Sequence, residues 1–238
     1  MTSKSEIGIA SVGMQVDAKP AKRPQRTTLE GRAISVVPLD PSTHVDALFN
    51  GTRGKENEPL WLYLFDGPFD TRFKFESYLR EKASSEDPLF FAIIENVSGD
   101  AVGHAAYMRI EPAHRVIEVG SLLYTPRLQR TIGATEAMYL MARHVFEDLG
   151  YRRYEWKCNA LNAPSRGAAL RLGFTFEGVF RQHMIVKGRN RDTAWFSMLD
   201  SEWPKRKIAF EKWLDPLNFD TSGQQKVSLS ALNAEGED

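Results

Sequence analysis

Hydrophobic and polar positions change their period several times along the chain. Residues 89–94 form a continuous apolar run, and 101–110 and 116–124 continue with strand-like composition between turn signals, which predicts a meander of three strands. Residues 134–149 instead carry apolar side chains on one helical face, and Gly150 follows as a C-terminal cap. The pattern therefore predicts strands and helices within one α/β domain.

Further segments complete this predicted domain. Strands are expected at 33–37, 154–158, 174–186 and 193–199, and helices at 45–50, 70–82, 162–172 and 202–214. No repeat of fixed period interrupts the order, and the two ends of the chain are polar without periodicity. We therefore expect a flexible tail at 1–29, the folded domain at 30–200, a helical extension at 201–220 and a second flexible tail at 221–238.

Composition narrows the classes of function. The 31 Lys and Arg residues balance the 31 Asp and Glu residues, so no net field would hold the protein on nucleic acid or an anionic membrane. The longest apolar run, Leu89 to Ile94, is far below the roughly 20 residues that cross a bilayer. The single cysteine, Cys158, excludes an internal disulfide and suits a reducing compartment. We expect neither nucleic-acid nor membrane partners.

The first 29 residues bear on localisation. They lack an apolar stretch of the about 7 to 15 residues that a secretory signal needs, which favours a cytoplasmic protein. Basic residues slightly outnumber acidic ones there, so a mitochondrial transit peptide is the alternative, opposed by Glu6 and Asp17. The chain also has no His-Glu-x-x-His motif and no paired cysteines, and no metal site is predicted.

The most informative motif joins residues 116–124 to the following helix. It reads Gln129-Arg130-Thr131-Ile132-Gly133-Ala134-Thr135-Glu136-Ala137. Backbone N–H groups at a helix start are unpaired, and with the helix dipole they attract phosphate. A second motif, Asn162-Ala163-Pro164-Ser165, opens a short helix that ends near Leu172-Gly173-Phe174. Together the two motifs look like an acetyl-CoA site.

In their order and spacing these motifs resemble the GCN5-related N-acetyltransferase (GNAT) family, over residues 30–200. Within it the chain is similar to the RimJ/RimL-like subgroup of bacterial ribosomal-protein N-terminal acetyltransferases. The shared features are Glu118-Val119-Gly120, Ala134-Thr135-Glu136-Ala137, Glu177-Gly178, and Gly188 followed by Asp192. The resemblance implies a single domain with a central mixed, mostly antiparallel sheet flanked by helices. It also implies an acyltransferase that takes acetyl-CoA as its acyl donor.

The family's pyrophosphate loop is written Gln/Arg-x-x-Gly-x-Gly/Ala, and this chain matches it imperfectly. One register places Gln129 first and Ile132 at the glycine. The other places Arg130 first and Gly133 at the glycine, but leaves Thr135 at the final small position. The first is preferred because the residues after the loop fit the subgroup. If the glycine position needs a positive φ, the β-branched Ile132 would be strained.

The resemblance assigns the cofactor contacts to particular residues. Phosphate binding falls to the loop and helix start, namely Gln129, Arg130, Thr131, Ile132, Gly133, Ala134 and Thr135. Asn162 would hydrogen-bond the pantetheine arm, and Ser165 lies one helical turn further on the same side. Arg166 could reach the adenosine phosphates, as could Arg127 or Arg130.

Acetyl transfer to an amine needs a base for the amine and a proton for the departing thiolate. The resemblance makes Glu118, on the strand before the loop, the expected general base; a surface carboxylate on an alternating strand is the alternative. Many family members use a tyrosine acid where this chain has Ala169, so Ser165 takes that role by position, as suggested for RimL-like enzymes. His104 and His183 are expected to be structural or to line the groove.

The predicted acceptor is a primary amine. The resemblance implies a protein N-terminus, while Asp66 and Asp70 leave a small cationic amine open. Aromatic side chains gather nearby, at Trp61, Tyr63, Phe65, Phe69 and Phe73. Such groups form core or a homodimer contact more often than a ligand cage. Ile132 and Ala169 keep a second interpretation open, a catalytically silent acyl-CoA-binding regulatory module.

Overall fold

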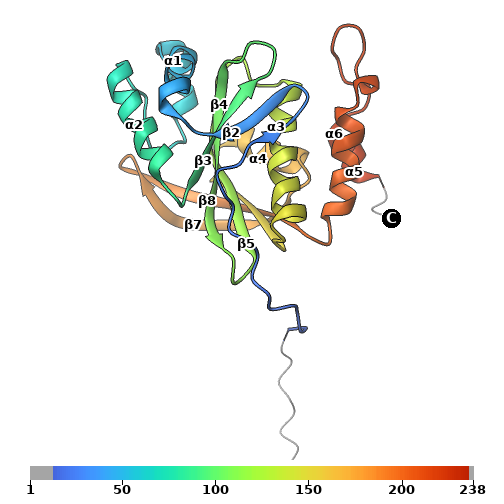
Figure 1. The fold of residues 1–238 in the computed structure, drawn as a ribbon. Coiled ribbons are helices and arrows are strands. Elements are labelled where there is room, and N and C mark those ends of the chain that lie inside the picture. Colours follow the sequence, from blue (N-terminus) through green and yellow to red (C-terminus); the bar gives the residue numbers. More distant parts are fainter. Residues whose placement is uncertain (1–12, 236–238) are drawn as a thin grey trace, which may run out of the picture.

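The computed structural model describes residues 13–235, which form one eight-stranded sheet with helices on both faces (Figure 1). The strands are β1 (Leu29–Glu30), β2 (Ile34–Pro38), β3 (Leu89–Glu95), β4 (Ala101–Glu111), β5 (Val116–Tyr124), β6 (Arg153–Asn159), β7 (Thr175–Val186) and β8 (Arg189–Leu199). Their order is β1-β2-β3-β4-β5-β6-β8-β7, and only β5 and β6 are parallel. The predicted mixed, mostly antiparallel sheet is confirmed.

The helices are α1 (Pro41–Thr52), α2 (Arg72–Ser84), α3 (Ile132–Arg143), α4 (Ala163–Arg171), α5 (Trp203–Leu214) and α6 (Leu229–Ala234). The structure also contains two 3-10 segments, η1 (Lys55–Trp61) and η3 (Pro216–Asn218). A π-helical segment, η2 (His144–Asp148), directly continues α3. Figure 1 shows α1 and α2 on one face of the sheet and α3 and α5 on the other. Each face therefore has its own apolar core.

A buried carboxylate fixes the start of α3 against the sheet. Glu136 accepts hydrogen bonds from the backbone N–H groups of Arg32, Ala33 and Ile34, at 2.9, 2.7 and 3.0 Å. A Cβ atom at Gly133 would lie 2.6 Å from the Ile34 side chain, so glycine permits this close approach. The predicted long helix is confirmed, and its first turn has a defined place over the sheet.

The parallel strands β5 and β6 pair over only part of their length. The register joins Val116 to Arg153 and ends at Val119 and Trp156. Beyond this point β5 pairs with β4, and β6 pairs with β8. Here β5 also bulges, at Ser121 with a φ of 49°, and a bulge re-aims the side chains that follow it. The sheet is therefore open between the C-terminal ends of β5 and β6.

The C-terminal segment differs from the flexible tail predicted at 221–238. Within it α6 packs on the domain: Leu229 is fully buried, and Asn233 donates a hydrogen bond to the Arg171 carbonyl oxygen at 3.1 Å. A helix of 6 residues in a polar stretch is too short to show a helical period, which explains why the pattern predicted no helix. Residues 236–238 of this predicted tail lie outside the described chain.

The N-terminal segment also touches the domain before β1. The backbone N–H groups of Ala21 and Lys22 donate to the carbonyl oxygens of Pro112 and Leu149, at 3.0 and 2.9 Å. Of the tail predicted at 1–29, residues 1–12 lie outside the described part. Between residues 13 and 235 no helix has both the length and the apolar composition that crossing a bilayer requires.

His104 on β4 is fully buried beneath α2. Its Nε2 atom lies 3.1 Å from the Tyr78 hydroxyl, and its Nδ1 atom has no hydrogen-bond partner among residues 13–235. Burial lowers the pKa of this imidazole to about 4. His104 is therefore neutral at pH 7, and its neutral ring helps to hold α2 on the sheet.

We expect the burial of His104 to make stability depend on pH. An unfolded histidine titrates near pH 6.5, so between about pH 6.5 and 4 the unfolded chain binds a proton that the folded protein excludes. The free energy of unfolding should fall with pH across this window, by on the order of 3 kcal/mol. Urea unfolding at pH 7 and pH 4 measures it. His104→Gln should lose less; an equal loss in both proteins would contradict this origin.

Candidate functional site

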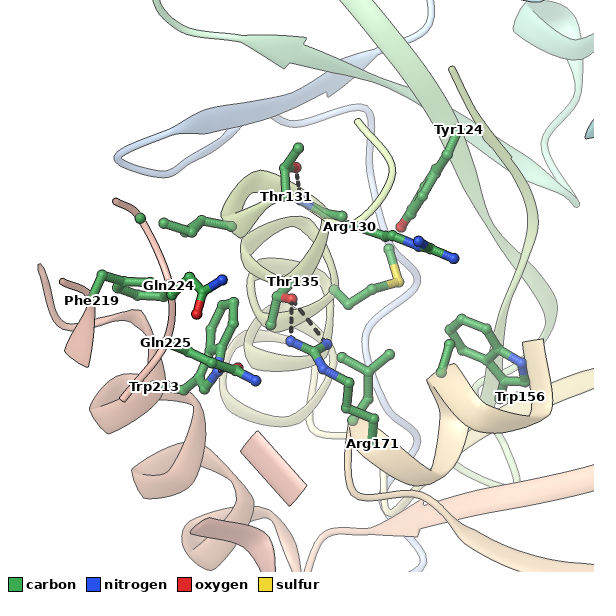
Figure 2. Close-up of a pocket in the computed structure, with 16 residues that line it drawn as sticks. Tyr124, Arg130, Thr131, Thr135, Trp156, Arg171, Trp213, Phe219, Gln224 and Gln225 are labelled. Atoms are coloured by element: carbon green, nitrogen blue, oxygen red, sulfur yellow. Dashed lines mark hydrogen bonds between the residues drawn. The ribbon is translucent and has the colours of Figure 1, made fainter. Parts of the chain in front are cut away.

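A cavity of about 710 Å³ opens beside the first turns of α3 (Figure 2). Its walls come from α3, from α4, from the end of β5, from Trp156 on β6 and from the C-terminal segment that follows Lys212. Small-molecule sites commonly have volumes of about 300 to 1,000 Å³. The cavity thus lies where β5 and β6 diverge and where α3 begins, and its size fits an organic ligand.

The start of α3 presents polar groups to this cavity. Thr131 caps the helix through its hydroxyl, which accepts the Ala134 N–H at 3.2 Å. Helix geometry leaves the N–H groups of Ile132 and Gly133 without an acceptor inside α3. The positive φ in this loop belongs to Arg130, at 61°, while Ile132 is the first helical residue. The strain considered for Ile132 is therefore absent, and its N–H is available to an anion.

Arg171 crosses from α4 to α3 at the centre of the cavity. Its two Nη atoms each donate to the Thr135 hydroxyl at 3.1 Å (Figure 2). The guanidinium also stacks on the Trp213 ring, with 4.9 Å from Cζ to the centroid. Burial lowers the pKa of Arg171, and no carboxylate of residues 13–235 forms an ion pair with it. The cavity thus contains a cation that an anionic ligand can neutralise.

An aromatic wall from the C-terminal segment closes one side of the cavity. Trp213 and Phe219 meet edge to face with centroids 5.2 Å apart. Gln225 fixes the indole, because its Oε1 atom accepts the Trp213 Nε1–H at 2.6 Å. Trp213 lies in the helix that the sequence predicts at 202–214, but the sequence pattern gives it no ligand role. No sequence signal could have predicted this contact, because residues 213–225 reach the start of α3 only through tertiary packing.

Tyr124 and Trp156 form the opposite wall (Figure 2). The Tyr124 hydroxyl is buried without a hydrogen-bond partner in the described chain, and burial raises its pKa far above the usual value. The phenol therefore remains protonated at pH 7 and can donate a hydrogen bond into the cavity. Trp156 donates its Nε1–H to the Ser165 hydroxyl at 3.0 Å. This contact links the wall to the predicted Asn-x-x-Ser motif.

Five predicted cofactor residues line the cavity: Arg130, Thr131, Ile132, Ala134 and Thr135. Two neighbours in the loop make internal contacts instead. Gln129 donates to the Tyr124 carbonyl oxygen at 3.0 Å, and Gly133 packs on Ile34. Their local roles are thus to hold the loop and to let α3 approach the sheet.

The second motif lies beside the cavity on α4. Asn162 caps this helix, with its Oδ1 atom accepting the Ser165 N–H at 3.1 Å. Arg166 donates to the Ala160 carbonyl oxygen at 3.3 Å. Asn162, Ser165 and Arg166 are absent from the cavity wall of the described structure, so their contacts with a cofactor stay predictions.

Glu118 lies on the other face of the sheet. Its register partner Met108 packs against the core under α1 and α2, and Glu118 is only 2% exposed. Arg109 binds both carboxylate oxygens, at 2.7 and 3.1 Å, and the Lys157 ammonium lies 3.0 Å from Oε2. The predicted base is thus a buried carboxylate held by two cations.

These ion pairs continue along the strands into a balanced network. Lys157 also binds Glu155 at 2.6 Å, and Arg153 joins Glu155 at 2.6 Å to Glu177 at 2.5 Å. Hydrogen bonds from Arg153 lower the pKa of Glu177 to about 2. The three cations Arg109, Arg153 and Lys157 therefore face the three carboxylates Glu118, Glu155 and Glu177, and the network has no net charge.

Of the residues that the sequence suggests for an acceptor site, some lie in the core and others on the surface. Trp61 is buried, and Phe69 meets it edge to face at 5.3 Å, so both belong to the core. Phe73 is exposed. Asp66 pairs with Lys82 at 3.2 Å and Asp70 pairs with Lys74 at 3.0 Å. These two aspartates are therefore already neutralised.

Comparison with known proteins identifies similar domains. The model of the acetyltransferase (GNAT) domain matches residues 36–175. The structure of a GCN5-related N-acetyltransferase from Brucella melitensis is similar at 50% identity and a TM-score of 0.89, with 91% of this chain and 98% of that chain covered. A probable GNAT-family acetyltransferase from Chromobacterium violaceum ATCC 12472 has 39% identity and a TM-score of 0.75, with 82% and 98% covered.

A more distant structure bears on the subgroup. RimL, a ribosomal L7/L12 alpha-N-protein acetyltransferase, shares 19% identity at a TM-score of 0.62, with 73% of this chain and 94% of that chain covered. This likeness supports the fold alone and does not establish the RimJ/RimL-like subgroup. No curated protein matches the chain.

We expect Lys157 to be the energetic centre of the buried network. Lys157→Met would leave two buried carboxylates short of a cation, and removing one partner of a buried pair costs about 3 kcal/mol of unfolding free energy. Arg127→Gln is the matched control, because its pairs with Glu95 and Asp100 are exposed and should contribute less than about 1 kcal/mol. Denaturant unfolding of both variants measures the difference, and equal losses would refute the assignment.

Proposed function

The chain belongs to the GNAT acetyltransferase family, and from this premise we propose that it transfers an acetyl group from acetyl-CoA to a primary amine. GNAT domains generally use acetyl-CoA. The observation that carries the proposal is the cavity beside α3, which runs from the helix start to the opening between β5 and β6. Such a cavity suits a ligand with phosphates at one end and a reactive acyl group at the other.

The residues of the cavity fit the parts of acetyl-CoA. The N–H groups of Ile132 and Gly133 and the Arg130 side chain would bind the pyrophosphate, because a helix start and a guanidinium both favour anions. Arg171 and Trp213 would hold the nucleotide end, through charge and through stacking on the aromatic wall. The acyl group would then lie at the opening of the sheet, near Tyr124.

The proposed transfer is a direct attack by the amine. The amine nitrogen forms an amide bond with the thioester carbonyl carbon, and the carbon–sulfur bond breaks. The amine proton passes to Glu118 directly or through water, and the thiolate takes a proton from a donor in the cavity. The Tyr124 side chain in the cavity wall supports that role because its hydroxyl has no hydrogen-bond partner in the described chain; Ser165 is the position that the resemblance implies. A thiolate also leaves readily without a strong acid.

Glu118 can accept the amine proton only if one of the two cations bound to its carboxylate moves away. Arg109 is the partner that can move, because its side chain is 48% exposed, whereas Lys157 is 2% exposed. A substrate amine that approaches from the α1 and α2 face would compete with Arg109 for the same carboxylate. We retain a protein N-terminus and a small amine as acceptor classes, and cytoplasm as the compartment.

The test of this function joins binding to turnover. Isothermal titration with acetyl-CoA should show binding, and thiol release against N-terminal peptides and polyamines should show transfer. Glu118→Gln should keep acetyl-CoA affinity and lose roughly 100-fold or more in turnover, as expected for removing a general base. Binding without turnover on any acceptor would favour the silent acyl-CoA-binding module. An absence of binding would reject the proposal.

Arg171 should contribute to cofactor affinity. Arg171→Leu removes the guanidinium in the cavity, and loss of a charge-assisted contact should weaken CoA binding about tenfold or more. Arg189→Leu, exposed on the β7–β8 hairpin and outside the cavity wall, is the control and should bind CoA as the wild type does. Titration calorimetry measures both, with melting temperature as a check on folding. Equal affinities in the two variants would contradict a role for Arg171.

A further inference from the structure

Arg191 is a buried cation without an acidic partner. It lies on β8 and is 7% exposed. Its Nε atom donates to the Thr193 hydroxyl at 3.2 Å, and its guanidinium lies over the Phe65 ring at 5.2 Å. No carboxylate of residues 13–235 lies within ion-pair distance of it. The two Nη groups are therefore free to bind another acceptor.

Two neighbouring charges act on Arg191 in opposite directions, because Glu118 raises the pKa of its guanidinium and Arg109 lowers it. The network of Arg109, Glu118, Lys157, Glu155, Arg153 and Glu177 already contains equal numbers of cations and carboxylates. Arg191 thus adds one positive charge to this face of the sheet. Burial lowers the pKa of its guanidinium more than Glu118 raises it, as expected for a cation that has lost its water without gaining an anion in direct contact. A ligand with one negative charge would restore the balance.

A second unsatisfied donor lies on the same strand face. Arg191, Thr193 and Trp195 alternate along β8, so their side chains share one side of the sheet. The Trp195 Nε1–H is buried and has no acceptor in the described residues. Trp195 pairs in register with Lys157, whose ammonium lies 3.8 Å from the indole centroid and 3.0 Å from Glu118. Donor groups of Arg191 and Trp195 thus lie on the face of the sheet that carries the proposed base, and no acceptor for them is present in the described residues.

We propose that the amine acceptor carries a carboxylate and that Arg191 binds it. This inference rests on the proposed acetyl transfer, whose acceptor would lie on this face with Glu118. A guanidinium fork matches the two oxygens of a carboxylate, and one carboxylate supplies the single charge that the face lacks. A phosphate monoester would bring about 1.5 to 2 charges at pH 7 and leave an excess. The substrate class is therefore an amino acid or a short acidic peptide with a free amine.

The fold holds this site between a loop and a hairpin. Phe65 comes from the loop between η1 and α2 and is 46% exposed. Lys187, at the turn between β7 and β8, donates through its ammonium to the carbonyl oxygens of Trp61, Asp66 and Gly67, at 2.9, 3.0 and 2.9 Å. The loop and the strand that carry Phe65 and Arg191 are thus fastened to each other, and the Phe65 ring forms the outer cover of the site.

Matched acceptors that differ only in a carboxylate test the proposal. The pairs are glycine against glycinamide, and N-terminal peptides with Asp against Asn at the second position. Wild type should acetylate the acidic member of at least one pair roughly 10- to 100-fold more efficiently. Arg191→Gln should remove that preference through KM, and Arg191→Lys should restore part of it. Arg189→Gln, exposed on the same hairpin, is the matched control.

Stability separates a binding role from a structural one. If Arg191 is kept for a ligand, Arg191→Gln should melt at the same temperature as wild type or higher without ligand, because it removes an unpaired buried charge. A clear drop in its melting temperature would mark Arg191 as structural and overturn the proposal. So would equal use of acid and amide acceptors, or an equal loss on both in Arg191→Gln.

A binding experiment tests the inference independently of the proposed function. N-acetylglycine and N-acetylglycinamide are added to the protein, with and without CoA, and melting temperature is followed. A shift with the acid that Arg191→Gln abolishes would support the site even if the peptide panel shows no turnover. No carboxylate-dependent shift and no preference in turnover would overturn it, while bound acetyl-CoA would leave the proposed function standing.

Discussion

The parallel pairing of β5 and β6, and its end after Val119 and Trp156, is the constraint on which the site depends. Parallel neighbours need a crossover, and α3 supplies it, so the helix begins beside the carboxyl end of β5. Ligands of open α/β sheets bind outside the carboxyl ends of strands. The cavity beside α3 accordingly lies where the two strands diverge.

The two faces of the sheet carry different charged groups. On the α3 face, Arg171 and the aromatic wall of the C-terminal segment border a cavity, and none of the described residues that line it is a carboxylate. On the other face, Glu118 and Lys157 belong to a buried and balanced ionic network. Each face thus has a buried or partly buried guanidinium, Arg171 or Arg191, that forms no ion pair with a carboxylate of residues 13–235. The sheet separates these two electrostatic environments except where β5 and β6 diverge.

Local patterns predicted the fold well because the signals are local. The apolar run at 89–94, the helical face at 134–149 and the helix start at Asn162 lie within short stretches, and the structure contains the expected elements. The site was predictable only where it is contiguous, at the start of α3. Arg171 and Trp213 reach the cavity through tertiary packing, which leaves no period in the sequence.

The ion-pair partners of Glu118 could likewise not be predicted from the sequence. Its strand and its place before the loop follow from the sequence, but its two cations come from β4 and β6. Alternation along one strand cannot reveal such partners, because they depend on the register between strands. The strain expected at Ile132 is absent for a similar reason: the loop places its positive φ two residues earlier, at Arg130, which the sequence alone does not reveal.

The aromatic wall of the cavity has a consequence for biosynthesis. The last strand of the sheet ends at Leu199, whereas Trp213, Phe219 and Gln225 follow it in the chain. Ribosomes add about 5 to 20 residues per second, so the sheet can form seconds before this wall exists. A nascent chain at that stage has the α3 start but only part of the cavity wall. The cavity is therefore complete only after residue 225 has been synthesised and has reached the folded sheet.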